Sequence, residues 1–248
     1  MLSSCIQAVV MCPDVAKKAQ AEIDAVIGDD RVPNWSDYEK APYGAAIVEE
    51  SHRWRPAAPL PVPHALSEGK LPPLSLRGLN LISCIDEWID GKFLPKGTAN
   101  FLSVWGLHHD ESEFPDHHVF HPDHYKGRTL LESEYANSAE YDNRGHYGYG
   151  NGRRLCPGIH LADRNFFHTI SKNLWAFDID KAVDPKTGKS IIPVTNAVTC
   201  SRGALSACAY EFPCKLTVRS RAKRETIMKE YAEAKADVFP QYGKTGMF

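Results

Sequence analysis

One short stretch constrains this chain more than any other: residues 149–158, which read Tyr-Gly-Asn-Gly-Arg-Arg-Leu-Cys-Pro-Gly. A single cysteine, Cys156, stands there in a glycine-rich turn just after two arginines. Glycines such as Gly152 and Gly158 can adopt positive φ, and successive amide hydrogens in such a turn can point at the sulfur. Hydrogen bonds of this kind tune a metal-bound thiolate. The stretch therefore predicts a loop that presents a thiolate to a metal.

The residues after Cys156 predict a helix that begins beside the sulfur. Pro157 suits a first helical turn, and apolar residues recur at helical spacing through Phe166, Ile170 and Leu174. The positive end of this helix dipole would favour the anionic form of the thiol. A lone cysteine is most often a buried structural thiol, so the neighbours of Cys156 carry the metal-ligand interpretation.

Written as aromatic-x-x-Gly-x-Arg-x-Cys-x-Gly, the stretch resembles the haem-ligand loop of the haem-thiolate monooxygenases, the cytochrome P-450 family. Tyr149, Gly152, Arg154 and Gly158 occupy the fixed positions of that pattern around Cys156. The resemblance implies that these residues bind haem b, iron-protoporphyrin IX, with Cys156 as the axial ligand of the iron. The stretch is similar to that of fungal members such as the O-methylsterigmatocystin oxidoreductase group.

A second motif lies upstream, in a helical run that ends at a proline. Glu50 and Arg53 are three residues apart, so they share one helical face; alone they would be an ordinary surface ion pair. Followed by Trp-Arg-Pro, they resemble the family's Glu-x-x-Arg helix, which implies that the pair locks the core on the cysteine side of the haem. His124 stands where the family usually has the arginine that completes a triad, and it lacks the planar fork of arginine.

The same resemblance implies where the haem edge and the substrate would lie. Residues 59–64 follow the Glu-x-x-Arg helix at the point where the family's chain passes the haem edge. His64 would meet a haem propionate there, or it is an ordinary loop histidine; both interpretations stay open. The implied substrate-pocket residues, from this segment and from a terminal sheet, are Leu60, Pro61, Val62, Ala204 and Leu205.

Composition excludes several classes of protein. The 248 residues are 43% hydrophobic and 24% charged, with a formal net charge of −2. Interleaved charges leave no patch suited to nucleic acid. Seven cysteines, an odd number without paired short spacings, favour a reducing compartment over a disulfide scaffold. No stretch approaches the ~18 apolar residues of a membrane span, so we expect a soluble chain without a membrane-spanning helix.

Histidines crowd one segment and raise the alternative of a zinc site. No His-Glu-x-x-His or Cys-x-x-Cys pattern accompanies them. We therefore interpret them as polar residues on a helix end and a loop. They are His108, His109, His117, His118, His121 and His124.

We predict a mainly α-helical fold with small β-sheets, the C-terminal portion of the cytochrome P-450 fold with its N-terminal half missing. Residues 1–248 would form one partial domain, and residues 1–28 resemble the end of the family's long distal helix and the next helix. The distal acid and threonine would lie upstream, so no catalytic residue can be assigned. Residues 221–248 predict a charged C-terminal helix and tail that leaves the fold in solvent.

One internal segment does not match its flanks. Residues 69–85 are rich in proline and leucine and carry almost no charge. We interpret them as the translation of a retained intron. The alternative is a genuine surface loop, which loop entropy permits, because doubling a loop costs only about 0.6 kcal/mol.

These resemblances imply a haem-dependent monooxygenase that inserts an oxygen atom into a small organic, secondary-metabolite-like substrate. Dioxygen would be the second substrate, and an NADPH-dependent flavoprotein reductase would supply electrons. Full-length relatives would sit on the cytosolic face of the endoplasmic reticulum membrane. The alternative is a catalytically inactive truncated product, or a fragment that binds haem without turnover.

Overall fold

The computed structural model describes residues 1–60, 86–128, 130–137, 144–152, 155–196, 201–202 and 206–242. The predicted insertion at 69–85 lies outside these ranges. Within them, no helix is long and apolar enough to cross a bilayer.

Two helices open the chain, α1 (Leu2–Met11) and α2 (Pro13–Ile27), separated at Cys12. Pro13 separates the two helices, because this proline occupies the first turn of α2. Ala19 and Ile23 are fully buried, as the apolar spacing predicts. A short 3-10 helix, η1 (Trp35–Lys40), then leads into α3 (Pro42–Trp54).

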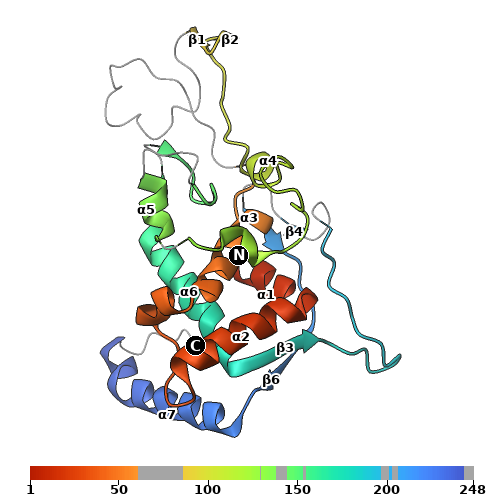
Figure 1. The fold of residues 1–248 in the computed structure, drawn as a ribbon, viewed down its shortest axis with the longest axis vertical. Helices are drawn as coiled ribbons and strands as arrows, with labels where there is room; N and C mark the ends of the chain where they lie inside the picture. The colour runs from red at the N-terminus through yellow and green to blue at the C-terminus, as the bar shows by residue number, and fades with distance from the viewer. Residues whose placement is uncertain are drawn as a thin grey trace.

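The middle of the chain contains short elements. Strands β1 (Glu87–Ile89) and β2 (Lys92–Leu94) form an antiparallel hairpin. Asp90 and Gly91 form its two-residue turn with φ of 49° and 73°, the positive values that match the strand twist. In Figure 1 this hairpin stands away from the body of the molecule. The helices that follow are α4 (Val104–His108), η3 (Pro122–Tyr125) and α5 (Glu132–Asn137).

The C-terminal part joins one long helix to small sheets. Helix α6 (Ile159–Ala176) runs directly into β3 (Phe177–Lys181), which pairs antiparallel with β6 (Cys214–Val218). Strand β4 (Ser201–Arg202) pairs with β5 (Cys208–Ala209). Phe177 and Ile179 alternate with two aspartates that face solvent, the period of a strand.

The core lies where α1, α2, α3 and α6 pack together (Figure 1). Its fully buried side chains include Ile23, Ile47, Phe167 and Trp175. The Trp175 indole donates to the Gly28 carbonyl oxygen at 2.8 Å, so this aromatic ring is fixed as well as buried. The predicted fold class, mainly α with small sheets, is confirmed.

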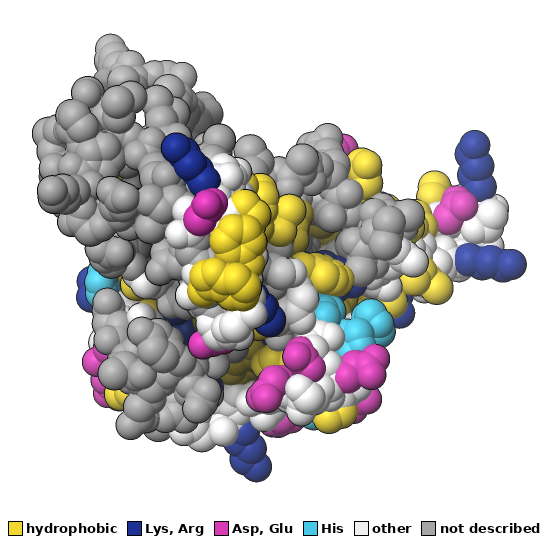
Figure 2. Space-filling view, turned by 90° about the horizontal axis from the view of Figure 1, so that it is seen from above, with side chains coloured by type: hydrophobic (Ala, Val, Ile, Leu, Met, Phe, Trp, Pro, Cys, Tyr) yellow, Lys and Arg dark blue, Asp and Glu magenta, His cyan; other side chains and the backbone are white. Residues whose placement is uncertain are grey.

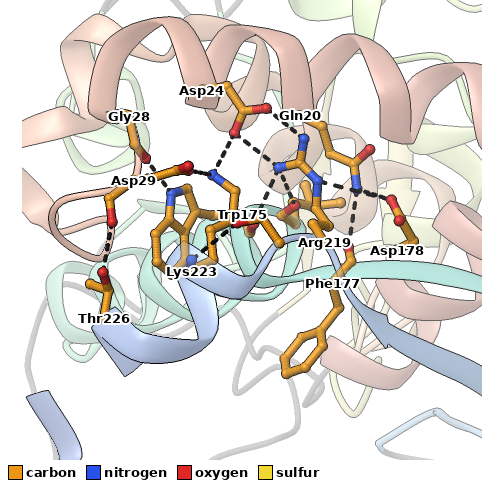
Figure 3. A network of polar contacts seen from close by, with 12 residues as sticks. Gln20, Asp24, Gly28, Asp29, Trp175, Phe177, Asp178, Arg219, Lys223 and Thr226 are labelled. Carbon is orange, nitrogen blue, oxygen red and sulfur yellow. Dashed lines mark hydrogen bonds and ion pairs between the residues drawn. The ribbon is translucent and has the colours of Figure 1, made fainter. Parts of the chain in front are cut away.

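The last helix, α7 (Arg221–Asp237), precedes a short 3-10 turn, η6 (Phe239–Tyr242). We expected this helix to leave the fold in solvent, and its first turns do not. Figure 3 shows Lys223 of α7 between Asp24 and Asp29, with Arg219 also paired to Asp24. The Lys223 ammonium lies 4.7 Å from the centre of the Trp175 ring. The helix is charged as predicted, but its partners are carboxylates almost 200 residues earlier.

Candidate functional site

The cysteine loop is a hydrogen-bonded turn. The Cys156 N–H donates to the Tyr149 carbonyl oxygen at 2.9 Å, and the Leu155 N–H donates to the Gly152 carbonyl oxygen at 3.0 Å. Gly152 has φ of 62°, the left-handed conformation in which glycine costs least. Cys156 is a half-buried free thiol. The loop therefore holds the cysteine backbone at a fixed place and leaves its sulfur unpaired.

The helix after the loop begins two residues later than Pro157 suggests. Gly158 is the N-cap of α6 with φ of −87°, so the expectation of positive φ there was wrong. A β-carbon at 158 would lie 3.8 Å from the Cys156 sulfur. The glycine thus leaves one side of the sulfur open. No side chain caps α6, and its N-terminal amides place positive potential beside Cys156.

Glu50 and Arg53 form a buried pair in which every guanidinium hydrogen has an acceptor. The Arg53 Nε and Nη2 atoms donate to the two Glu50 oxygens at 2.7 and 2.6 Å. The remaining three hydrogens go to the carbonyl oxygens of His108, His117 and Val119 at 2.9 to 3.0 Å. Both side chains are completely buried. The pair therefore ties α3 to the 108–119 segment, with all five donors used.

The Glu50 carboxylate is equally well occupied. Besides Arg53, its oxygens accept the His121 backbone N–H at 2.7 Å and face His124 Nδ1 at 3.3 Å. The structure thus brings Glu50, Arg53 and His124 together. Because His124 contributes one long contact, the backbone of His121 supplies much of what a second arginine would have given.

The opposite side of α3 faces the cysteine loop, and the sequence analysis missed it. Tyr149 Oη donates to Asp163 Oδ1 at 2.6 Å and lies 3.2 Å from His52 Nε2. Residues 49–53 of α3 are all polar and all buried. That run, inside a helix with apolar flanks, is the sequence signal that could have revealed a second polar face.

Three ligand-type side chains also meet beside α3. Donor atoms of Glu49, Glu132 and His146 lie within 4.8 Å of one another, and all three residues are buried. His146 Nδ1 accepts the Gly148 N–H at 3.0 Å, so the ring hydrogen is on Nε2, which faces Glu49 Oε2 at 3.1 Å. A nitrogen that carries hydrogen has no lone pair for a metal. In this arrangement the His146 Nε2–H is directed at the Glu49 carboxylate.

Burial governs the protonation of this cluster. It raises the pKa of Glu132 to about 10, with the neighbouring Glu49 charge as the second cause, and it raises the pKa of Glu49. Burial and the charge of Arg144 lower the pKa of His146 to about 3. Apart from the Glu49 carboxyl, no side chain among the described residues is a hydrogen-bond partner of either Glu132 oxygen. At neutral pH the two carboxyl groups hold at least one proton, and the imidazole is neutral.

The crowded histidines do not assemble a zinc site within the described residues, since no three of them bring ligand atoms together. His109 stacks on Trp105 with ring centres 3.7 Å apart, and His117 Nε2 lies 3.5 Å from Glu111. Figure 2 shows histidine side chains gathered beside acidic ones on one part of the surface.

Several predicted site residues cannot be placed. Arg154, His64 and four of the five pocket residues, Pro61, Val62, Ala204 and Leu205, lie outside the described residues. Leu60 is described and is 48% exposed. It lies next to Pro59, whose carbonyl oxygen accepts the Trp105 N–H at 3.0 Å.

The residues of the cysteine loop fit a haem iron. A thiolate is one of the axial ligands that haem iron takes in proteins, and Cys156 offers one beside an uncapped helix N-terminus. Cys5 shows the contrast, because complete burial raises the pKa of its thiol to about 12. A thiol of that kind is an inert packing group.

Comparison with known proteins agrees with this site. The cytochrome P-450 family model matches residues 2–198. Cytochrome P-450 monooxygenase macC of Penicillium terrestre is 44% identical over 242 residues, covering 98% of this chain and 42% of that protein. Cytochrome P-450 monooxygenase patH of Aspergillus clavatus is 44% identical over 237 residues, covering 96% and 40%. The chain thus spans about two fifths of the length of these fungal relatives.

The fold agrees as well. A zebrafish cytochrome P-450 structure with abiraterone superposes with a TM-score of 0.66 at 22% identity, covering 88% of this chain and 42% of that one. The cysteine loop, the buried Glu-x-x-Arg pair and the family model that spans both of them lead to one conclusion. This chain belongs to the cytochrome P-450 family.

Proposed function

We propose that the protein carrying this chain is a haem-dependent monooxygenase in which Cys156 is the axial ligand of a haem b iron. The observation that supports this most is the free, half-buried Cys156 thiol, held by its backbone N–H and placed beside the uncapped N-terminus of α6. When bound, haem supplies the activation of dioxygen, which a thiolate ligand promotes by donating electron density.

The residues of this chain would position that group. The Tyr149 carbonyl oxygen fixes the Cys156 backbone, and the α6 N-terminus favours the thiolate over the thiol. Glu50, Arg53 and His124 hold the segments on the cysteine side of the haem. Arg154 and His64 are the proposed partners of the haem propionates.

The family suggests a substrate class and a redox partner for the protein. We infer a small organic substrate of the secondary-metabolite kind, with electrons from an NADPH-dependent flavoprotein reductase at the cytosolic face of the endoplasmic reticulum. The fungal relatives named as monooxygenases support this assignment. The proposed pocket residues are Leu60, Pro61, Val62, Ala204 and Leu205.

The test is Cys156→Ser in the longest form of the protein that the gene encodes. We expect the variant to lose the red-shifted Soret band of the ferrous carbon monoxide complex, because that band requires a thiolate ligand. Cys208→Ser is the control, since Cys208 is an exposed thiol outside the loop. An unchanged band in Cys156→Ser would refute the ligand assignment.

A second candidate is a chain that binds haem without turnover. Haem binding and product formation, measured separately on the 248-residue chain, distinguish the two candidates. Stoichiometric haem uptake without product would favour the second.

A further inference from the structure

The Tyr149 side chain contacts two helices at once. Its hydroxyl has one hydrogen, which goes to Asp163 Oδ1 of α6 at 2.6 Å. The oxygen is then the acceptor for His52 Nε2 of α3, at 3.2 Å. The His52 imidazole N–H therefore donates to the Tyr149 phenol oxygen, and the Tyr149 O–H donates to the Asp163 carboxylate. Asp163 and His52 are both buried.

The main chain of Tyr149 makes the third connection. Its carbonyl oxygen accepts the Cys156 N–H at 2.9 Å. One residue thus joins α3, α6 and the backbone of the cysteine. An aromatic ring without a hydroxyl could fill the same space, but it could not tie the two helices together.

The His52 end of this connection cannot shift easily. The His52 ring stacks on His146 with centres 4.5 Å apart and planes 13° apart, and its edge meets Phe166 at 5.5 Å. A β-carbon at Gly148 would lie only 3.0 Å from His52 Nδ1 and 3.1 Å from His146 Nδ1. The backbone of 148 therefore packs against both rings, and only glycine allows this approach without displacement.

We propose that Tyr149 is a positioning residue, and that its hydroxyl, clamped between His52 and Asp163, fixes the cysteine loop and hence the Cys156 backbone against α3 and α6. This inference rests on the proposed function where it concerns the haem iron. The role of Tyr149 in holding the cysteine loop does not depend on haem.

Removal of the Tyr149 hydroxyl tests whether its two hydrogen bonds hold the cysteine loop. Tyr149→Phe keeps the ring and leaves a buried carboxylate and a buried imidazole N–H without their shared partner. Unsatisfied buried polar groups of this kind are costly, so the loop should open more often. The expected effect is faster hydrogen exchange of the 149–158 amides, by about fivefold or more.

Matched controls lie in the same loop and at the same carboxylate. Tyr147→Phe is the same chemical change two residues away, and no side-chain hydrogen bond of the Tyr147 hydroxyl occurs among the described residues. Asp163→Asn keeps an oxygen acceptor for Tyr149, whereas Asp163→Leu removes it. We expect Asp163→Leu to reproduce Tyr149→Phe, and Tyr147→Phe and Asp163→Asn to stay within twofold of the wild type.

The experiment measures hydrogen exchange of the haem-free protein and the midpoint potential of the haem-loaded protein, both in the longest encoded form. A shifted potential in Tyr149→Phe, together with faster loop exchange, supports positioning. If Tyr149 served the fold alone, the folded fraction would keep the wild-type potential. Wild-type exchange in Tyr149→Phe and Asp163→Leu, or equal effects in Tyr147→Phe, would overturn the inference. A protein that takes up no haem would refute the proposed function, while the exchange measurement would still decide the role of Tyr149 in the loop.

Discussion

The buried Glu50–Arg53 pair allows one stability prediction to be worked from geometry. Glu50→Gln keeps the shape of the side chain and removes its charge. The carboxylate faces four donors, two from Arg53, the His121 N–H and the His124 ring. A glutamine amide accepts at its oxygen but places an N–H₂ group against donors on its other side.

The cost follows from complete burial. Arg53 would keep its charge in a site with no access to water, and breaking a buried pair by removal of one charge costs about 3–5 kcal/mol. Arg53→Lys keeps the charge but has three donors where five are used. We expect it to cost at least about 2 kcal/mol, because carbonyl oxygens of the 108–119 segment lose their partners.

The assay is equilibrium denaturation by urea, followed by circular dichroism and tryptophan fluorescence. The matched control is Glu225→Gln, which disrupts a Glu–Arg pair on α7 whose side chains are largely exposed. Exposed pairs contribute little, so this variant should unfold at the wild-type midpoint. Equal midpoints for Glu50→Gln and Glu225→Gln would refute the argument that burial and full hydrogen bonding make the first pair different.

Three further outcomes are expected. Glu132→Gln should reduce the pH dependence of stability, because burial raises the pKa of Glu132 in the folded protein to about 10. The folded state therefore holds more protons than the unfolded state, and wild-type stability falls as pH rises from about 5 toward 10, by at most about 1.4 kcal/mol per pH unit. Urea midpoints at pH 6 and pH 8.5 test this, and equal slopes for variant and wild type would contradict it. His146→Gln should reduce acid sensitivity, because burial lowers the pKa of His146 in the folded protein to about 3. The unfolded state then binds the extra proton, so wild-type stability falls as pH drops from about 6.5. Thermal melts at pH 7 and pH 5 measure the difference. Lys223→Met should loosen α7 by about 1 kcal/mol, since its partners Asp24 and Asp29 are half exposed; hydrogen exchange over 221–237 would increase, and unchanged exchange would show that packing alone holds the helix.

Local sequence patterns predicted the features that depend on residues close together in the sequence. The apolar run after Cys156 predicted α6, and the resemblance of residues 1–28 to two successive helices agrees with α1 and α2. The cysteine loop and the Glu50–Arg53 pair were recognisable because their residues lie close in sequence.

Contacts between distant segments were beyond such patterns. His52 and Asp163 meet Tyr149 from positions 97 residues before and 14 residues after it. The polar run 49–53 indicates a second polar face on α3, but it does not identify Tyr149 as the partner. The packing of α7 against α2 was not predicted for the same reason. The charged residues of α7 can pair with one another at i,i+4, so its sequence alone does not call for distant partners. The end of α6 cannot be located from spacing alone, because Phe177 suits the helical period as well as the strand alternation that follows.

The ion pairs that hold the start of α7 against α2 also have a consequence for folding during translation. Asp24 and Asp29 leave the ribosome with α2, yet Arg219 and Lys223 are made 194 to 199 residues later. During translation the end of α2 therefore carries acidic groups whose cationic partners do not yet exist. The contact between α2 and α7 can form only after the start of α7 has emerged, which makes it later than the packing of α1 on α2.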